Sequence, residues 1–153
     1  VEKEKLDLVL RAGKLSPTAC NNQPQRILVI ESEEALEKLK KCTKYHFNAP
    51  MALLVCYDKD VSWKRSFDGD DSGVVDASIV ATHMMLQAAE IGLGTTWVGY
   101  FDPALIIKEF SLPGNFVPVA LLPIGYPSED AKPFNGHYKR NSIDKSVFYN
   151  KFS

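Results

Sequence analysis

The segment from Val74 to Ile91 places apolar residues around nearly the whole circumference of a helix. These residues are Val75, Ile79, Ala81, Met84, Met85, Leu86, Ala88, Ala89 and Ile91. A helix that is apolar on all sides has to be covered on all sides. The chain has 153 residues, which is enough for one core but not for a very large one. We therefore expect a partner subunit to cover one face of this helix, which Gly92 should end.

Strand and helix patterns alternate along the rest of the chain. The expected helices cover Glu2 to Ala12 with a stop near Gly13, the turns after a Ser32 cap (Ala35, Leu36, Leu39), and Ala104 to Phe110 after an Asp102 cap. The expected strands cover Ile27 to Ile30, Met51 to Tyr57, Thr95 to Val98 and Val117 to Ile124. This order predicts an α/β or α+β layered fold, with residues 1–153 in a single domain.

Composition and charge exclude several classes of function. The net charge of −1 gives no general electrostatic attraction to nucleic acid or to an anionic membrane. No apolar run approaches the roughly 20 residues that cross a bilayer. The three cysteines, Cys20, Cys42 and Cys56, lack metal-ligand or redox spacing, and the histidines lack zinc-ligand spacing. We expect no metal site and a cytoplasmic location.

Ser16 to Gln25 forms an unusually polar junction between the first helix and the first strand. Two prolines restrict its backbone and remove two donors. Asn21, Asn22 and Gln23 place amide donors and carbonyl acceptors side by side, which suits the edge of a planar heterocycle. An ordinary Pro/Asn turn explains the same composition when the segment is considered alone.

Considered with later segments, this loop resembles that of the FMN-dependent nitroreductase family. Pro17, Thr18, Asn21, Gln23 and Pro24 match the family's Pro-Ser/Thr-x-x-Asn-x-Gln-Pro loop after the first core helix. The segment from Gly92 to Gly99, the Gly125-Tyr126-Pro127 turn and the basic pair Lys139-Arg140 follow in the family's order. The resemblance covers nearly the whole chain, although the family's Arg-rich segment before the first helix is not present in it.

The resemblance implies a fold, a cofactor and a reaction. The fold is α+β, with a central, mainly antiparallel sheet flanked by helices in three layers and a C-terminal arm that extends to the partner subunit. Family members are homodimers whose two FMN sites contain residues from both subunits. NAD(P)H delivers hydride to flavin N5, and a small planar electron acceptor such as a nitroaromatic or quinone then takes its place. The cofactor performs the redox chemistry, so we expect no catalytic acid, base or nucleophile.

The resemblance also implies which residues hold FMN. The predicted contacts are Pro17, Thr18, Ala19, Asn21, Gln23, Lys44, Trp97, Val98, Gly99, Tyr100, Lys139 and Arg140. Arg140, with Lys139 second, is expected at the phosphate, and Lys44 near flavin N1 and O2, with Lys64 and Arg65 as weaker candidates. The Gly92 to Tyr100 segment is expected near flavin N5, and the loop from Pro17 to Asn21 at the partner's flavin.

Two alternatives remain open at this point. One is another enzyme on the same fold, such as a reductive dehalogenase or a flavin-destroying enzyme. The other is a non-catalytic flavin-binding or interaction protein. Binding of FMN separates the flavin-dependent alternatives from a plain structural domain, and reduction of the bound flavin by NADH or NADPH identifies a reductase.

Overall fold

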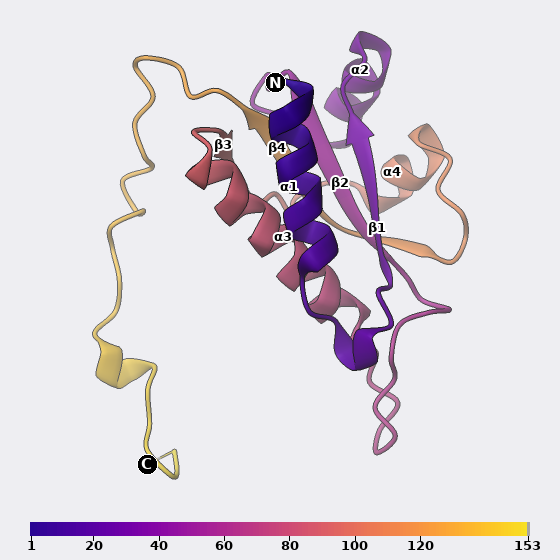
Figure 1. Cartoon of the computed structure of the whole chain (residues 1–153), viewed down its shortest axis with the longest axis vertical. Helices are drawn as coiled ribbons and strands as arrows, with labels where there is room; N and C mark the ends of the chain where they lie inside the picture. The colour runs from indigo at the N-terminus through magenta and orange to yellow at the C-terminus, as the bar shows by residue number, and fades with distance from the viewer. Residues whose placement is uncertain (153) are drawn as a thin grey trace.

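The computed structural model describes residues 1–152, which form four α-helices, four strands and two short 3-10 turns (Figure 1). The helices are α1 (Lys3–Leu15), α2 (Glu33–Cys42), α3 (Gly73–Glu90) and α4 (Pro103–Glu109). The strands are β1 (Gln25–Ile30), β2 (Met51–Asp58), β3 (Gly94–Thr95) and β4 (Phe116–Gly125). The 3-10 turns are η1 (Ala19–Asn21) and η2 (Ile143–Lys145).

The four strands form one antiparallel sheet in the order β1-β2-β4-β3. Its centre is β2, in which every residue is buried, as its continuous apolar sequence predicts. In the register, Ile27 of β1 pairs with Val55, and Leu54 of β2 pairs with Leu121 of β4. A register shift between Val55 and Cys56 marks a bulge in this central pairing.

Helices cover both faces of the sheet and make two separate cores. On one face, α1 and α3 pack on the sheet around Val9, Leu53, Val80, Met84 and Leu122. On the other face, α2 and α4 pack around Leu39, Leu54, Ile106 and Leu121. The expected three-layer α+β fold with a central antiparallel sheet is therefore confirmed.

The caps at the helix ends follow the sequence signals. The Ser32 hydroxyl accepts a hydrogen bond from the Ala35 amide at 3.2 Å and starts α2. The Asp102 carboxylate accepts from the amide of Ala104 at 2.9 Å and starts α4, with Pro103 in its first turn. Gly92 follows α3 with a φ of +79°, the left-handed conformation expected of a residue that ends a helix.

Two sequence predictions about element ends are wrong. Gly13 does not end the first helix. Helix α1 continues to Leu15, and at Gly13 it packs closely on α3. A Cβ atom at Gly13 would come within 2.9 Å of the Met84 sulfur, so the missing side chain serves helix contact instead of termination. The strand expected over Thr95 to Val98 is also shorter: β3 ends at Thr95, and Val98 makes only an isolated bridge to Leu121.

Within one chain, α3 is buried on one face and exposed on another, and the expected cover of that second face by a partner stays a prediction. Ala77, Val80, Ala81, Met84 and Ala88 are buried against the sheet and α1. The other face leaves Val75 59% and Leu86 66% exposed, with Thr82 and His83 also exposed between them. A helix this apolar with one uncovered face leaves open the expectation that a partner covers it.

After β4 the chain leaves the three layers and runs alongside them as an extended arm, drawn in yellow in Figure 1. Its aromatic residues are exposed, with Phe134 at 83%, Tyr149 at 84% and Phe152 at 90%. The docking of Val147, Phe148, Tyr149 and Phe152 on another surface stays a prediction. Across residues 1–152, no helix combines the length and the apolar character needed to span a bilayer.

Candidate functional site

The polar loop between α1 and β1 has a strained backbone. Cys20, Asn21 and Gln23 have φ values of +51°, +56° and +52°, in the left-handed region that residues with side chains seldom adopt. Asparagine tolerates this region better than most residues. Such strain persists only where the surroundings over-determine the conformation, so the contacts that hold the loop are part of the site.

A buried carboxylate of α3 holds the first half of the loop. Asp76 is 2% exposed, and its Oδ1 atom accepts a hydrogen bond from the Ala19 amide at 2.9 Å. Its Oδ2 atom accepts from the Ser72 hydroxyl, also at 2.9 Å. Within the loop, the Thr18 hydroxyl accepts from the Gln23 amide at 3.0 Å. The predicted residue Ala19 is thus fixed to the N-terminal end of α3, and Thr18 is fixed to Gln23 within the loop.

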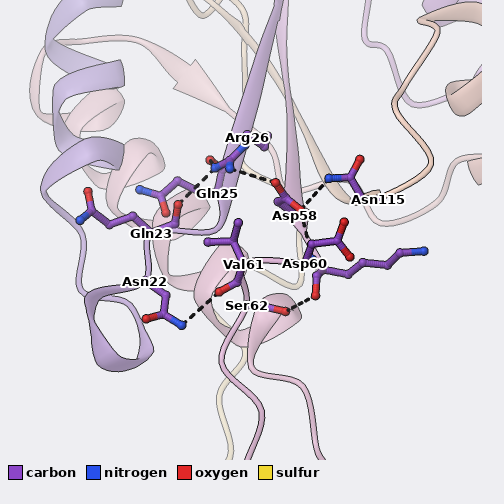
Figure 2. Close-up of polar contacts among 10 residues, drawn as sticks. Asn22, Gln23, Gln25, Arg26, Asp58, Asp60, Val61, Ser62 and Asn115 are labelled. Carbon is purple, nitrogen blue, oxygen red and sulfur yellow. Dashed lines mark hydrogen bonds and ion pairs between the residues drawn. The ribbon is translucent and has the colours of Figure 1, made fainter.

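A second network holds the other half of the loop (Figure 2). Arg26 donates from Nη1 to the carbonyls of Gln23 and Gln25 at 3.2 and 2.9 Å, and from Nη2 to Asp58 at 3.0 Å. Asp58 is 6% exposed and accepts a further bond from Asn115 Nδ2 at 2.8 Å. Burial raises the pKa of Asp58, but the bonds from Asn115, the Asp60 amide and Arg26 outweigh it and lower that pKa overall.

These contacts leave the outer side of the loop available to a ligand. Pro17, Asn21 and Gln23 are exposed. The Asn22 side chain donates to the Val61 carbonyl at 3.0 Å, and the Gln23 side chain donates to the Asn21 carbonyl at 3.2 Å. The Asn21 amide side chain makes no hydrogen bond to any of residues 1–152, so it keeps its full capacity for an external partner.

Lys44 and Tyr100 come together on the other side of the sheet, where α2 ends and α4 begins. The Lys44 ammonium lies 5.2 Å from the Tyr45 ring centre and 5.4 Å from that of Tyr100. The Thr43 hydroxyl donates to the Tyr100 carbonyl at 2.6 Å and thereby ties the two segments together. They line an open hollow of about 510 Å³ that also contains Phe101. Lys44 has no carboxylate partner within residues 1–152.

The segment from β3 to this hollow contains Trp97, Val98 and Gly99. These residues differ in their exposure and in their free polar groups. Trp97 is 36% exposed, and Gly99 is exposed as well. Val98 is 4% exposed, and its amide and carbonyl both pair with Leu121 at 2.9 Å. Val98 therefore has no free polar group, and a backbone donor for a flavin would come from its neighbours.

The predicted phosphate residues lie in the arm. Lys139 and Arg140 are exposed, and among residues 1–152 Arg140 donates only to the carbonyls of Lys139 and Gly136, at 2.8 and 3.4 Å. Lys64 and Arg65, the weaker candidates for the flavin N1 and O2 position, are paired with nearby carboxylates: Lys64 faces Asp71, and Arg65 pairs with Asp68 and Asp70. Within residues 1–152 Arg140 has no carboxylate partner, whereas Arg65 has two.

One chain assembles the predicted residues in three places instead of one. The loop from Pro17 to Gln23 is attached to α3 and the end of β2, on the side of α1. Lys44 and Tyr100 adjoin the α2 and α4 layer, and the basic pair lies on the arm.

The predicted site residues offer groups that can bind a ligand. No group of three or more metal-ligating side chains occurs within residues 1–152. Burial raises the pKa of the Cys56 thiol to about 12 and also raises that of Cys42, so neither is a nucleophile. The predicted site offers free amides, exposed aromatic edges and cations without carboxylate partners, which match a planar, carbonyl-edged and phosphorylated ligand.

Sequence reasoning missed the residues that support the loop. Asp76, Arg26, Asp58 and Asn115 fix it without belonging to any motif. The sequence did carry a signal for Asp76. An acidic residue inside an apolar helix pattern is rarely buried without a partner, so its position indicates a contact with another segment. Asp58 and Asn115 had none, because their contact joins β2 to the turn before β4 across a separation of 57 residues.

Comparisons with known proteins agree with this architecture. A family model described as "Nitroreductase family" matches residues 1–46 and 41–126. A protein of Methanothermobacter thermautotrophicus named "Putative NADH dehydrogenase/NAD(P)H nitroreductase" is 31% identical over 137 residues, covering 85% of this chain and 69% of that protein.

Two solved structures from Clostridium difficile share the fold. A nitroreductase family protein is 46% identical, with a TM-score of 0.93 over 99% of this chain and 88% of that one. A protein described as an FMN-dependent nitroreductase is 30% identical, with a TM-score of 0.79 over 99% of this chain and 90% of that one. The chain therefore belongs to the nitroreductase family.

Proposed function

We propose that this protein is an FMN-dependent oxidoreductase that uses NAD(P)H to reduce a small planar acceptor, such as a nitroaromatic or a quinone. The observation that carries the proposal is a set of polar side chains with free hydrogen-bonding capacity within residues 1–152 that match FMN: the Asn21 amide, the Lys44 ammonium and the Nε and Nη2 atoms of Arg140. Relatives named as an NAD(P)H nitroreductase and an FMN-dependent nitroreductase support it.

Each group suits one part of the cofactor. The free amide of Asn21 can donate to ring carbonyls and accept from ring N–H groups. Lys44 places a positive charge beside Tyr100, where an anionic ring edge would be stabilised. Arg140 can bind a phosphate through two parallel N–H bonds, with Lys139 adding a second charge. Trp97, Gly99 and Tyr100 offer exposed surface for the flat face of the ring.

FMN, when bound, would accept hydride from NAD(P)H at N5 and pass electrons to the acceptor. The protein's own groups would bind and orient the ring, and the positive charge at Lys44 would favour its reduced, more negative form. We assign no acid, base or nucleophile, because no histidine, carboxylate or thiol joins the proposed contacts.

We infer further that the protein is a homodimer with each FMN site built from two chains. The uncovered apolar face of α3, around Val75 and Leu86, is the surface that a second copy would cover. The extended arm exposes the aromatic side chains of Phe134, Tyr149 and Phe152, and it would lie on the partner. The loop and the Lys44 hollow, attached to different layers, would meet across this interface.

The test is anaerobic reduction of the reconstituted protein. The protein is loaded with FMN, freed of excess cofactor, and mixed with NADH or NADPH while the flavin absorbance is recorded. We expect bleaching with at least one donor and recovery on addition of a nitroaromatic or quinone. Retained FMN that neither donor bleaches would overturn the reductase and favour a passive flavin-binding protein.

Arg140→Ala tests the phosphate contact. Hydrogen bonds to charged groups contribute about 1.5–3 kcal/mol, so the dissociation constant for FMN should rise by about one to two orders of magnitude. Lys145→Ala, which removes another exposed cation of the arm, is the matched control and should leave it unchanged. Equal dissociation constants for the two variants would remove Arg140 from the site.

A further inference from the structure

We propose that Arg26 and Asp58 form a clamp that positions the cofactor loop and sets how tightly FMN is held. This inference rests on the proposed function, because it assumes that the loop contacts FMN. Neither residue belongs to the sequence motif, and neither lies among the groups assigned to touch the cofactor. Their role would be to hold the Gln23 to Gln25 backbone in the one conformation that presents Asn21 and Gln23.

The guanidinium of Arg26 joins three groups at once. Its Nη1 atom donates to the carbonyls of Gln23 and Gln25, and its Nη2 atom donates to Asp58, as Figure 2 shows. Only a planar fork with several donors can make this set of bonds. The ring of Phe116 lies against the guanidinium, 5.5 Å from its central carbon, and fixes its orientation from the other side.

Asp58 is itself fixed by groups from outside the loop. Asn115 donates to Oδ1 at 2.8 Å, and the Asp60 amide donates to the same oxygen at 3.1 Å. The Asp58 amide donates to the Pro24 carbonyl at 2.9 Å, so Asp58 also binds the loop through its backbone. The clamp therefore ties the end of the loop to the end of β2 and to the turn before β4.

The clamp acts at the point where the backbone needs support. Gln23 has a φ of +52° and sits between the Thr18 hydroxyl, which its amide contacts, and Arg26, which its carbonyl contacts. A residue with a side chain keeps this conformation only under such constraint. Without Arg26 the loop should populate ordinary conformations, and FMN would have to select the competent one.

The experiment compares a substitution in the clamp with one outside it. Arg26→Lys retains a positive charge for Asp58 but cannot reach both carbonyls as well. Ser32→Ala removes the N-cap of α2 and leaves every bond to the loop in place. For each variant and the parent we would measure the melting temperature, the dissociation constant for FMN, and hydrogen exchange of the amides of Asn21, Asn22 and Gln23, which bond within the loop.

We expect Arg26→Lys to raise the FMN dissociation constant by about tenfold and to speed exchange of the three loop amides. Ser32→Ala should lower the melting temperature while changing the dissociation constant by less than about twofold. The clamp is overturned if Arg26→Lys lowers only the melting temperature, or if both variants weaken FMN in proportion to their loss of stability. Failure of the parent to bind FMN would overturn the proposed function, and loop exchange unaltered by Arg26→Lys would separately overturn the clamp.

Discussion

Replacing Leu86 with lysine should separate the two subunits and release FMN while leaving each chain folded. Leu86 lies on the uncovered face of α3 and is 66% exposed in the single chain. Lysine is a good helix former and carries a favourable charge near the C-terminal end of a helix. Because the side chain makes few contacts within its own chain, the substitution should change the chain's own stability by no more than about 0.5 kcal/mol.

The expected loss of dimer stability follows from the area that Leu86 still exposes. Complete burial of a leucine contributes about 1.5–3 kcal/mol, so burying the exposed two-thirds contributes about 1–2 kcal/mol. In a two-fold dimer the same contact occurs twice, which gives about 2–4 kcal/mol. The dimer dissociation constant should therefore rise by at least about 30-fold to 1,000-fold, before any cost of burying the new charge.

Sedimentation velocity over a range of concentrations measures the dissociation constant, and the flavin absorbance of each species reports its FMN content. Ile107→Lys is the matched control, because Ile107 is 42% exposed but lies on α4, in the opposite layer. We expect the control to stay dimeric and yellow and Leu86→Lys to become monomeric and colourless. A Leu86→Lys protein that remains a flavinated dimer would refute the interface, and a flavinated monomer would refute the shared site.

Three further predictions concern stability and reactivity. Gly73→Ala should destabilise the protein by about 1–3 kcal/mol in urea unfolding, because the new Cβ would overlap the buried ring of Tyr57; an unchanged midpoint would contradict this packing. In the apoprotein at pH 8, iodoacetamide should modify the exposed Cys20 but not Cys56, whose buried thiol has a pKa of about 12, as intact mass would show. Hydrogen bonds keep the pKa of Asp58 below its unfolded value, so the stability it contributes is present above about pH 3.9 and lost as the pH falls through the lowered pKa. Asp58→Asn should therefore flatten the acid limb of the stability curve, and an identical acid limb would exclude this role.

Local patterns were sufficient to predict most of the helices and strands, whereas their three-layer antiparallel arrangement came from the family resemblance. The apolar run over Met51 to Tyr57, the caps at Ser32 and Asp102 and the glycine at 92 each depend on neighbouring residues, and each appears in the structure as expected. The predicted helix end near Gly13 was wrong because glycine, which often ends helices, also allows two helices to approach closely. Only its contact with Met84, distant in sequence, distinguishes the two uses.

The sequence indicated candidate contacts of the site but not their supports. The loop, Lys44 and the basic pair come from the family resemblance, and a family's motifs record residues that a ligand needs at fixed spacing. Arg26, Asp58 and Asp76 act through the backbone of the loop, and their partners depend on the tertiary fold. The sequence indicated that one face of α3 is left for a partner but not which face, because apolar residues look alike in sequence whether their cover comes from the same chain or from another.

The most direct test of the two-chain FMN site is complementation in mixed dimers. One chain carries Asn21→Ala together with Gln23→Ala in the loop, and the other carries Arg140→Ala in the arm. Neither protein alone should retain FMN or oxidise NAD(P)H at the parent rate. If each site takes its loop from one chain and its phosphate residue from the other, every mixed dimer has one intact site and regains about half of the parent's bound FMN and activity. Mixed dimers that recover neither would show that each chain builds its own site, contrary to this account.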